Sequence, residues 1–144
     1  MTLKIKIRKV SDVKTPHYAH RGDSGVDLYS TEDLILQPME RRLVGTGLCM
    51  EIPLGYEGQV RPRSGLSAKY GITLTNCVGT IDSDYRGEIC CLMINLGNEP
   101  YTIEPGERIA QLIISPVVHV ETEFIEKIPE ETKRGSGGFG STGK

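Results

Sequence analysis

Short runs of hydrophobic residues recur along the chain and are separated by glycine, proline, asparagine and aspartate. Runs of this length, either alternating with polar residues or apolar nearly throughout, are typical of β-strands bounded by turns. No long amphipathic helical pattern lies between them, which excludes parallel β-α-β units. The pattern predicts an all-β sandwich or barrel-like domain with strands at 3–10, 25–29, 42–53, 57–62, 72–81, 87–96, 107–115 and 117–124.

One segment favours a helix instead. Residues 64–70, SGLSAKY, combine tolerable helix residues with a serine at the start. Serine is a preferred residue at helix N-termini, because its hydroxyl accepts a hydrogen bond from a free backbone amide. We therefore expect one short helix here, with Ser64 as its cap.

Two predicted strands, within 87–97 and 107–115, are apolar nearly throughout. Strands of this kind are covered on both faces. A chain of 144 residues fits one compact domain. In so small a domain, burial of both faces indicates a subunit interface as readily as a deep core, and we favour a homo-oligomer.

The composition narrows the class of protein. A hydrophobic share of 38% and a charged share of 25% are ordinary for a soluble globular protein. A net charge of −2 gives no general attraction to nucleic acid or anionic membranes, so any phosphate must be bound by a local cluster. No signal peptide is recognisable, and no segment approaches the roughly 20 apolar residues of a membrane span. We expect a cytoplasmic protein with neither nucleic acid nor membrane as a partner.

The cysteines and histidines show no spacing typical of metal ligands. Adjacent Cys90 and Cys91 would point to opposite faces of a strand. We expect buried free thiols in a reducing compartment, with zinc ligation as the alternative. The residues concerned are Cys49, Cys77, Cys90, Cys91, His17, His20 and His119.

The chain changes character near its C-terminus. Residues 133–144, KRGSGGFGSTGK, are rich in glycine, and we divide the chain into a β-rich domain, 1–132, and a flexible arm, 133–144. The arm matches a phosphate-loop pattern only weakly, since that loop also requires a strand before it and a helix after it. Its glycines, hydroxyls and Arg134 nevertheless suit an anion, and Phe139 is suited to stack on a nucleobase. A terminus that is simply disordered is the alternative.

Two further clusters contain charged groups. In 62–71, Arg63 and Ser64 stand at the predicted start of the helix, where free backbone amides favour an anion. An equal alternative is that Ser64 only caps the helix and Arg63 is an exposed side chain without a ligand. Residues 76–88 read as a hairpin that carries Asp82 and Asp84. These two carboxylates suit a metal pair, turn formation, or a general base for a water nucleophile, and their spacing does not separate the three.

Two polar residues interrupt apolar segments. In 24–30, SGVDLYS, Asp27 would face the opposite side of a strand from Val26 and Leu28. In 104–112, Gln111 interrupts an otherwise apolar strand. A buried amide needs hydrogen-bonding partners, so Gln111 is either a site residue or a satisfied core residue.

These five clusters, in this order and spacing, resemble the five motifs of the homotrimeric dUTPase family. The motifs are SGVDLYS, PRSGLSAKYG, GTIDSDYRGE, PGERIAQL and RGSGGFGSTG, and together they extend from Ser24 to Thr142. Two small departures are Ser24, where alanine is common, and Thr80, where a bulkier apolar residue is often found. Neither departure removes a reacting group.

The resemblance implies a jelly-roll-like, β-clip subunit, three of which would build three shared active sites. Each site would take the first four motifs from two subunits and the glycine-rich arm from the third. The implied reaction is hydrolysis of dUTP to dUMP and pyrophosphate, which keeps uracil out of DNA and supplies dUMP for thymidylate synthesis. The rival interpretations are dCTP deaminase, which should carry a glutamate where Asp82 stands, and a regulatory nucleotide-binding protein without catalysis.

The resemblance also implies roles for individual residues. Asp82 would deprotonate the water that attacks the α-phosphorus and accept a hydrogen bond from the sugar 3′-hydroxyl, and Gln111 would hold that water. Tyr85 would pack against the deoxyribose and exclude UTP. The uracil edge would be read by Asn76 and the backbone through Gly79, Thr80 and Ile81, returning near Cys90.

The remaining implied contacts concern the phosphates and the metal. Asp27 and Arg108 would form a supporting polar network. Mg²⁺ would be bound by phosphates and waters, with no direct side-chain ligand and with Asp27 acting at most through water. The phosphates would be held by Arg63, Ser64 and Gly65, and the arm would close over the substrate with Arg134, Gly138, Phe139, Gly140, Ser141 and Thr142.

Overall fold

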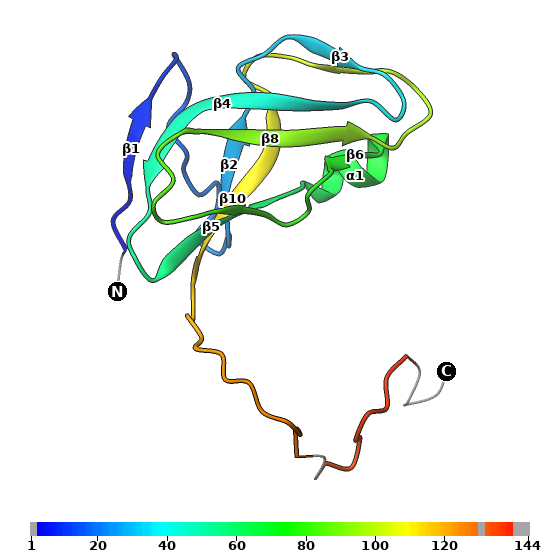
Figure 1. The fold of residues 1–144 in the computed structure, drawn as a ribbon. Helices are drawn as coiled ribbons and strands as arrows, with labels where there is room; N and C mark the ends of the chain where they lie inside the picture. Colours follow the sequence, from blue (N-terminus) through cyan, green and yellow to red (C-terminus); the bar gives the residue numbers. More distant parts are fainter. Residues whose placement is uncertain (1–2, 130–131, 140–144) are drawn as a thin grey trace.

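The computed structural model describes residues 3–129 and 132–139. These residues form ten β-strands and one short α-helix (Figure 1), which confirms the all-β prediction. The elements are β1 (Lys6–Lys9), β2 (Val26–Tyr29), β3 (Leu34–Leu36), β4 (Arg41–Glu51), β5 (Tyr56–Arg61), α1 (Ser64–Tyr70), β6 (Ile72–Leu74), β7 (Gly79–Ile81), β8 (Glu88–Asn95), β9 (Tyr101–Ile103) and β10 (Arg108–Pro116).

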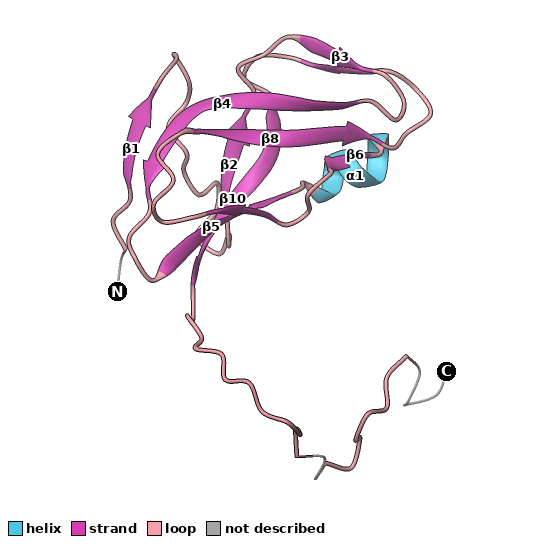
Figure 2. Cartoon of the chain, in the orientation of Figure 1, coloured by secondary structure: helices cyan, strands magenta, loops and turns pink. Residues whose placement is uncertain are grey.

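The strands form two antiparallel four-stranded sheets and one small two-stranded sheet (Figure 2). The strand orders are β1-β4-β8-β6, β2-β10-β5-β7 and β3-β9. Buried aliphatic side chains from both large sheets join one core, with Val44 and Ile89 from the first and Val60 and Leu112 from the second. The core is therefore aliphatic and lies between the two large sheets.

The predicted strand 72–81 is wrong as a single element. It divides into β6, which pairs with β8, and β7, which pairs with β5 in the other large sheet. The exposed residues 75–78 carry the chain between the two sheets. The predicted 76–88 hairpin is therefore wrong as well, because β7 forms its ladder with β5 and not with β8.

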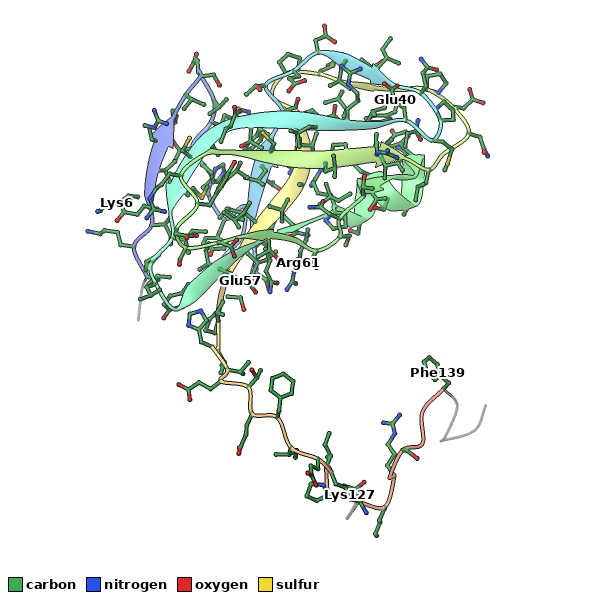
Figure 3. The ribbon with its side chains drawn as sticks, viewed as in Figure 1. Lys6, Glu40, Glu57, Arg61, Lys127 and Phe139 are labelled. Atoms are coloured by element: carbon green, nitrogen blue, oxygen red, sulfur yellow. The ribbon has the colours of Figure 1, made fainter. Side chains whose placement is uncertain are left out.

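Other predicted boundaries also change. Residues 117–124 form no strand; from Val117 the chain leaves the sheets as an irregular segment whose side chains project into open space (Figure 3). Val118 and Phe124 are 85% and 101% exposed. The short strands β3 and β9 were not predicted, because three residues are too few to establish an alternation.

The helix is confirmed at residues 64–70, but its cap differs from the prediction. Arg63 occupies the N-cap position without a side-chain hydrogen bond, and Ser64 is the first helical residue. The helix ends at Gly71, which adopts a left-handed φ of 72° and donates its amide to the carbonyl of Ser67 at 3.1 Å. Glycine reaches this conformation without a Cβ penalty, which explains the sharp stop before β6.

The two apolar strands are buried mainly on one face. In β8, Ile89, Cys91 and Met93 are buried, whereas the alternate residues, Leu92 and Ile94 among them, are half-buried. Within one chain the second face of β8 is only half-covered, and its coverage by another subunit stays a prediction. The outer face retains accessible apolar surface that a second subunit would cover.

The prediction for the cysteines is confirmed only in part. All four thiols are free, and Cys90 and Cys91 face opposite sides of β8. Cys49 and Cys91 are buried, but Cys77 is exposed because it lies in the segment that crosses between the sheets. Separately, no helix among the described residues is long and apolar enough to cross a membrane.

Candidate functional site

A polar cavity of about 500 Å³ opens beside β2, β10 and the start of α1. Loop 19–25 forms its remaining wall. The structure brings together here residues that lie far apart in the sequence, namely Asp27, Arg63, Ser64, Gly65, Arg108 and Gln111. We call this cavity the polar cleft.

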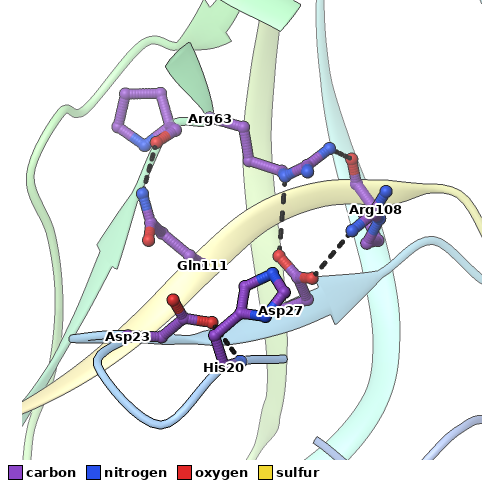
Figure 4. A network of polar contacts seen from close by, with 7 residues as sticks. His20, Asp23, Asp27, Arg63, Arg108 and Gln111 are labelled. Atoms are coloured by element: carbon purple, nitrogen blue, oxygen red, sulfur yellow. Dashed lines mark hydrogen bonds and ion pairs between the residues drawn. The ribbon is translucent and has the colours of Figure 1, made fainter. Parts of the chain in front are cut away.

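A carboxylate between two guanidinium groups organises the cleft (Figure 4). Asp27 Oδ1 lies 3.5 Å from Arg63 Nε, and Asp27 Oδ2 lies 3.4 Å from Arg108 Nη1. Arg63 also donates from Nη1 to the carbonyl of Arg108 at 3.2 Å. Since one negative charge faces two positive charges, the group retains a net positive charge that suits an anion.

The strand register explains why these residues meet. In the β2–β10 ladder, Asp27 is directly opposite Gln111, and Tyr29 is opposite Arg108. Residues opposite each other in an antiparallel pair project from the same face. Long-range pairing of β2 with β10 thus places the first and fourth motifs side by side.

Gln111 is half-buried and only partly satisfied by the protein. Its Nε2 donates to the carbonyl of Pro62 at 3.1 Å. A Cβ atom at Gly25 would lie 3.1 Å from Gln111 Oε1, so the glycine permits close approach of the amide. The hydrogen bond to Pro62 and the close approach to Gly25 together orient the Gln111 side chain in the cleft. Gln111 thus lies between Pro62 of the second motif and Gly25 of the first.

Asp82 lies in a different cavity of about 480 Å³, which it lines with Glu57, Asp84 and His119. It follows β7 directly and opens a turn in which its carbonyl accepts a hydrogen bond from the Tyr85 amide at 3.1 Å. Within the described parts of the chain, the Asp82 carboxylate has no ion pair and no hydrogen bond. It is therefore available to a ligand, in contrast to Asp27.

The neighbouring residues of the third motif are only partly assembled around Asp82. Tyr85 donates its hydroxyl to the carbonyl of Glu88 at 2.9 Å, which fixes a ring that is 44% exposed. Asn76 and Thr80 are exposed, and Gly79 is buried. Cys90 belongs to β8 in the other large sheet, so no backbone ladder joins it to Gly79, Thr80 or Ile81.

The strand register separates Asp82 from Gln111 within one chain. Gln111 of β10 is opposite Arg61 of β5, and Ile81 of β7, the residue before Asp82, is opposite Gly58 of β5. Arg61 and Gly58 are three residues apart along β5. Two strand spacings and three residues of rise amount to roughly 14 Å between the backbones. One chain therefore presents two separate half-sites.

The arm is apart from both half-sites. Arg134 donates from Nε to the carbonyl of Gly137 at 2.8 Å, and Phe139 is fully exposed, away from the sheets (Figure 3). Gly138 is likewise exposed. Gly140, Ser141 and Thr142 lie outside the described residues.

The chain offers few side chains to a metal ion. In residues 3–129 and 132–139, no group of three or more histidine, cysteine, aspartate or glutamate side chains is placed to hold one. Both oxygens of Asp27 already face guanidinium groups. This donor set fits an ion that is carried mainly by the oxygens of an anionic ligand and by water.

Residues 19–23, just before the first motif, are the part of the cleft that the motif pattern missed. His20 and Asp23 line the cleft, and Asp23 Oδ2 accepts the His20 amide at 2.8 Å (Figure 4). From the sequence, His20 was considered only as a possible zinc ligand. The place of residues 19–23 before the first motif was the one available signal, because the set of residues that line the cleft depends on the tertiary fold.

Comparison with known proteins identifies the relatives of this chain. The dUTPase family model matches residues 11–143. The deoxyuridine 5′-triphosphate nucleotidohydrolase of Nautilia profundicola is 54% identical over 143 residues, which cover 99% of this chain and 100% of the relative. The enzyme of the same name from Clostridium tetani is 51% identical over 143 residues, covering 99% and 97%.

Solved structures with the same fold are also found. The Staphylococcus bacteriophage 80alpha dUTPase with dUPNHPP has a TM-score of 0.91 at 29% identity, covering 99% of this chain and 100% of the other. A mutant dUTPase from phage phi11 of S. aureus, whose structure shows a coordinated structural Mg(II) ion, has a TM-score of 0.80 at 26% identity, covering 87% and 98%. The jelly-roll-like fold predicted from the motifs is thereby confirmed.

Proposed function

The chain belongs to the dUTPase family, and from this premise we propose that it hydrolyses dUTP to dUMP and pyrophosphate with Asp82 as the general base. The observation that carries the assignment is the contrast between two carboxylates. Asp27 is engaged by two arginines, whereas the Asp82 carboxylate is exposed and without a partner in the described residues. A carboxylate without a competing cationic partner is free to accept a proton from water.

The reaction is a single displacement at phosphorus. The water oxygen attacks the α-phosphorus while its proton passes to the Asp82 carboxylate. The bond from the α-phosphorus to the bridging oxygen then breaks, and pyrophosphate leaves with the electron pair. Asp82 also accepts a hydrogen bond from the 3′-hydroxyl, and Gln111, held by the Pro62 carbonyl, positions the water.

The polar cleft holds the triphosphate. Arg63 binds phosphate oxygens with its planar guanidinium, and Ser64 and Gly65 contribute at the exposed start of α1. Arg108 and Asp27 keep Arg63 in place through their mutual contacts. The developing negative charge on pyrophosphate is thus met by preorganised cations.

Selectivity for deoxyuridine comes from the third motif. The Tyr85 ring, fixed through its hydroxyl, packs against the deoxyribose and leaves no room for a 2′-hydroxyl. Asn76 and the backbone at Gly79, Thr80 and Ile81 read the uracil edge, with Cys90 at the return of the chain. A site built around specific hydrogen bonds rejects cytosine because buried groups would be left unsatisfied.

Mg²⁺ is the cofactor that we assign to the cleft. The residues present fit an ion held by phosphates and waters, with Asp27 supporting it through water. When bound, the ion withdraws electron density from the phosphate oxygens and eases departure of the leaving group.

The active form is a homotrimer whose sites are shared between chains. The separation of roughly 14 Å between the two half-sites supports this assembly, because one chain does not bring Asp82 beside Gln111. The half-buried outer face of β8 supplies apolar surface for the contact between subunits.

The arm of the third chain, residues 133–144, then closes over the substrate with Arg134 on the phosphates and Phe139 on the uracil. Hydroxyl and amide donors at Gly138, Gly140, Ser141 and Thr142 complete the closure.

The substitution Asp82→Asn tests the assignment. It removes the base but keeps the shape of the side chain, so binding of a non-hydrolysable dUTP analogue should be retained. Turnover of dUTP should fall by about 10²- to 10⁴-fold, as is typical for loss of a general base. Calorimetric titration measures the first quantity and pyrophosphate release the second.

Asp84→Asn is the matched control, since Asp84 is an exposed residue of the same turn and should leave turnover within about twofold. Unchanged turnover in Asp82→Asn would remove this residue from the mechanism. Deamination of dCTP by the natural chain would favour the deaminase alternative, and tight binding of dUTP without any turnover would favour a regulatory protein.

A further inference from the structure

A second cavity of about 560 Å³ adjoins the polar cleft. The two cavities share Arg63 and Arg108, which stand between them. The second cavity is bounded by Lys14 and His17 of the N-terminal loop, by Tyr29 at the end of β2, and by the start of β10. No motif includes Lys14 or His17, and the proposed reaction does not use them.

Lys14 is held at this cavity by an aromatic ring. Its Nζ lies 5.4 Å from the centroid of the Tyr29 ring, and Tyr29 is only 7% exposed. An ammonium group over an aromatic face is attracted by the ring quadrupole. No carboxylate among residues 3–129 and 132–139 forms an ion pair with Lys14, so its charge is held in place without a neutralising partner.

The cavity as a whole carries an excess of positive charge. Asp27 is the only carboxylate that contacts Arg63 and Arg108 in the described residues. Glu107 also lines the cavity, but its Oε1 accepts the Tyr101 hydroxyl and its Oε2 accepts the Glu104 amide at 3.1 Å. The cations of Lys14, Arg63 and Arg108 therefore face only two carboxylates in the described parts of the chain, those of Asp27 and Glu107. The Glu107 carboxylate is already hydrogen-bonded to the β9–β10 turn.

His17 places an imidazole ring at this cavity, and its Nε2 is a hydrogen-bond donor only when the ring is protonated. Its Nδ1 lies 3.3 Å from the carbonyl of Thr15, so the Nδ1–H tautomer or the imidazolium donates to that oxygen. This contact orients the ring and leaves Nε2 available to a ligand. A phosphate oxygen is a suitable partner for the protonated ring.

We propose that Lys14 and His17 form a diphosphate subsite that continues the polar cleft beyond Arg63 and Arg108. The subsite binds the terminal diphosphate of dUTP in the substrate complex, or the pyrophosphate that remains after bond cleavage. The inference rests on the proposed function, because it assigns the triphosphate to the cleft. Lysine binds phosphate as a point charge and complements the planar arginine groups beside it.

The subsite gives the enzyme a means to distinguish nucleotides by phosphate number. A monophosphate held at Ser64 and Gly65 would not extend past the arginine pair, whereas a triphosphate would reach Lys14. Lys14 and His17 are therefore positioning residues for the leaving group, and their removal should affect binding of diphosphate more than the chemical step.

The test uses the full chain with Lys14→Gln, and a double variant that adds His17→Gln. Inorganic pyrophosphate, dUMP and a non-hydrolysable dUTP analogue are titrated calorimetrically in the presence of Mg²⁺. Loss of one partly exposed charge should weaken pyrophosphate binding by about threefold to tenfold, and the double variant should weaken it further. Binding of dUMP should stay unchanged, and KM for dUTP should rise while kcat changes little.

The matched control is Lys9→Gln, which removes the same charge from the exposed end of β1, outside both cavities. It should leave all three affinities unaltered, and thermal unfolding of each variant checks that the fold is intact. Weaker binding of both pyrophosphate and the analogue supports a subsite used by substrate. Weaker binding of pyrophosphate alone supports a subsite used by the product.

Unchanged pyrophosphate and analogue affinities in the double variant would overturn the proposal, as would equal weakening of dUMP. The proposed function is tested independently by dUTP turnover of the natural chain. If that turnover were absent while the variants still lost pyrophosphate binding, the assigned reaction would fail and the anion subsite would stand.

Discussion

Two carboxylates of this enzyme, Asp27 and Asp82, have opposite electrostatic surroundings, and the roles that we propose for them rest on this difference. The Asp27 side chain is 19% exposed and lies between two guanidinium groups. Such a carboxylate fixes the positions of its two cationic partners. Asp82 stands on an exposed turn and has no comparable partner among the described residues. The first is suited to positioning and the second to proton transfer.

The role of Asp27 leads to a prediction at the residue scale. Asp27→Asn removes the charge that Arg63 and Arg108 share, so both guanidiniums lose their orientation toward the phosphates. We expect kcat/KM for dUTP to fall by about tenfold to a hundredfold, since small displacements of positioning groups have effects of this size. Steady-state kinetics measures the change.

Asp33→Asn serves as control, because Asp33 is exposed and does not line the polar cleft. It should leave kcat/KM unaltered. If Asp27→Asn were equally silent, the contacts of Asp27 with the arginines would have no part in binding substrate.

The cysteines give a second prediction at this scale. Burial raises the pKa of the Cys91 thiol to about 12, with the neighbouring Cys90 contributing. The thiolate is the reactive form, so at pH 8 only about 10⁻⁴ of Cys91 is reactive, even before steric protection. Burial, followed by the charges of Glu88 and Glu32, also raises the pKa of Cys90. In the folded protein we expect iodoacetamide to modify exposed Cys77 first and Cys91 only after unfolding.

Peptide mass spectrometry during the reaction gives the order of modification. The denatured protein is the reference, in which all four cysteines should react at similar rates. Modification of Cys91 as fast as Cys77 under native conditions would contradict its burial.

At the scale of elements, the junction between α1 and β6 is set by one glycine. Gly71 has φ of +72°, and a Cβ atom there would lie 2.5 Å from the backbone nitrogen of Gly97. The left-handed conformation and the contact with the turn after β8 both require glycine. This junction directs the chain from the polar cleft into the sheet that β8 shares with β6.

Gly71→Ala should therefore destabilise the fold strongly. The positive φ costs about 1 kcal/mol, and the backbone clash raises the total to roughly 2–4 kcal/mol in the free energy of unfolding. Gly55→Ala is the matched control: Gly55 has φ of +86° with nothing within 4 Å of its Cβ position, so only the conformational cost of about 1 kcal/mol applies. Chemical denaturation of both variants measures the difference, and equal losses would show that the clash relaxes without cost.

At the scale of the whole molecule, the proposed homotrimer would make assembly a condition of catalysis, because one chain keeps Asp82 apart from Gln111. The segment after β10 leaves the sheets (Figure 1). Its apolar side chains, among them Val120 and Phe124, are exposed. Exposed apolar side chains gathered along one segment indicate contact with another protein surface. In a homotrimer, such a segment would carry the arm toward a neighbouring site.

Deletion of residues 134–144 should leave folding intact, because none of the described residues 134–139 belongs to the core. It should nearly abolish dUTP hydrolysis, since Arg134 and Phe139 would no longer close over the substrate. Pyrophosphate release and thermal unfolding measure the two quantities, and full activity of the truncated protein would assign the arm no role in the site.

Mixing the truncated chain with the Asp82→Asn chain, followed by reassembly, should restore part of the activity. Some mixed sites would then combine an intact Asp82 from one chain with an intact arm from another. Each variant reassembled alone is the control and should remain inactive. Absence of rescue would argue against sites shared between subunits.

Much of this architecture was accessible from local patterns. Hydrophobic alternation predicted most strands because burial on one face of a sheet imposes a period of two residues. The helix at 64–70 and its motif were recognised from a short run of neighbouring residues. The candidate residues, from Asp27 to Arg134, followed from motifs that each span fewer than about a dozen positions.

The patterns failed where partners are distant in the chain. Residues 72–81 read as one strand because nothing local records that Leu74 pairs with β8 and Gly79 with β5. The contacts of loop 19–25 with β10, and of Lys14 with Tyr29, likewise arise only after the sheets have formed.

The sequence by itself therefore determined the fold class and the motif residues, Asp82 among them, because periodicity and side-chain chemistry are local properties. The tertiary structure alone decided that Asp27 is neutralised by two arginines, that Asp82 lies apart from Gln111, and that Lys14 and His17 adjoin the polar cleft. These facts depend on which strands and loops come together. Such long-range pairing is chosen by packing of the whole chain and not by any one segment of it.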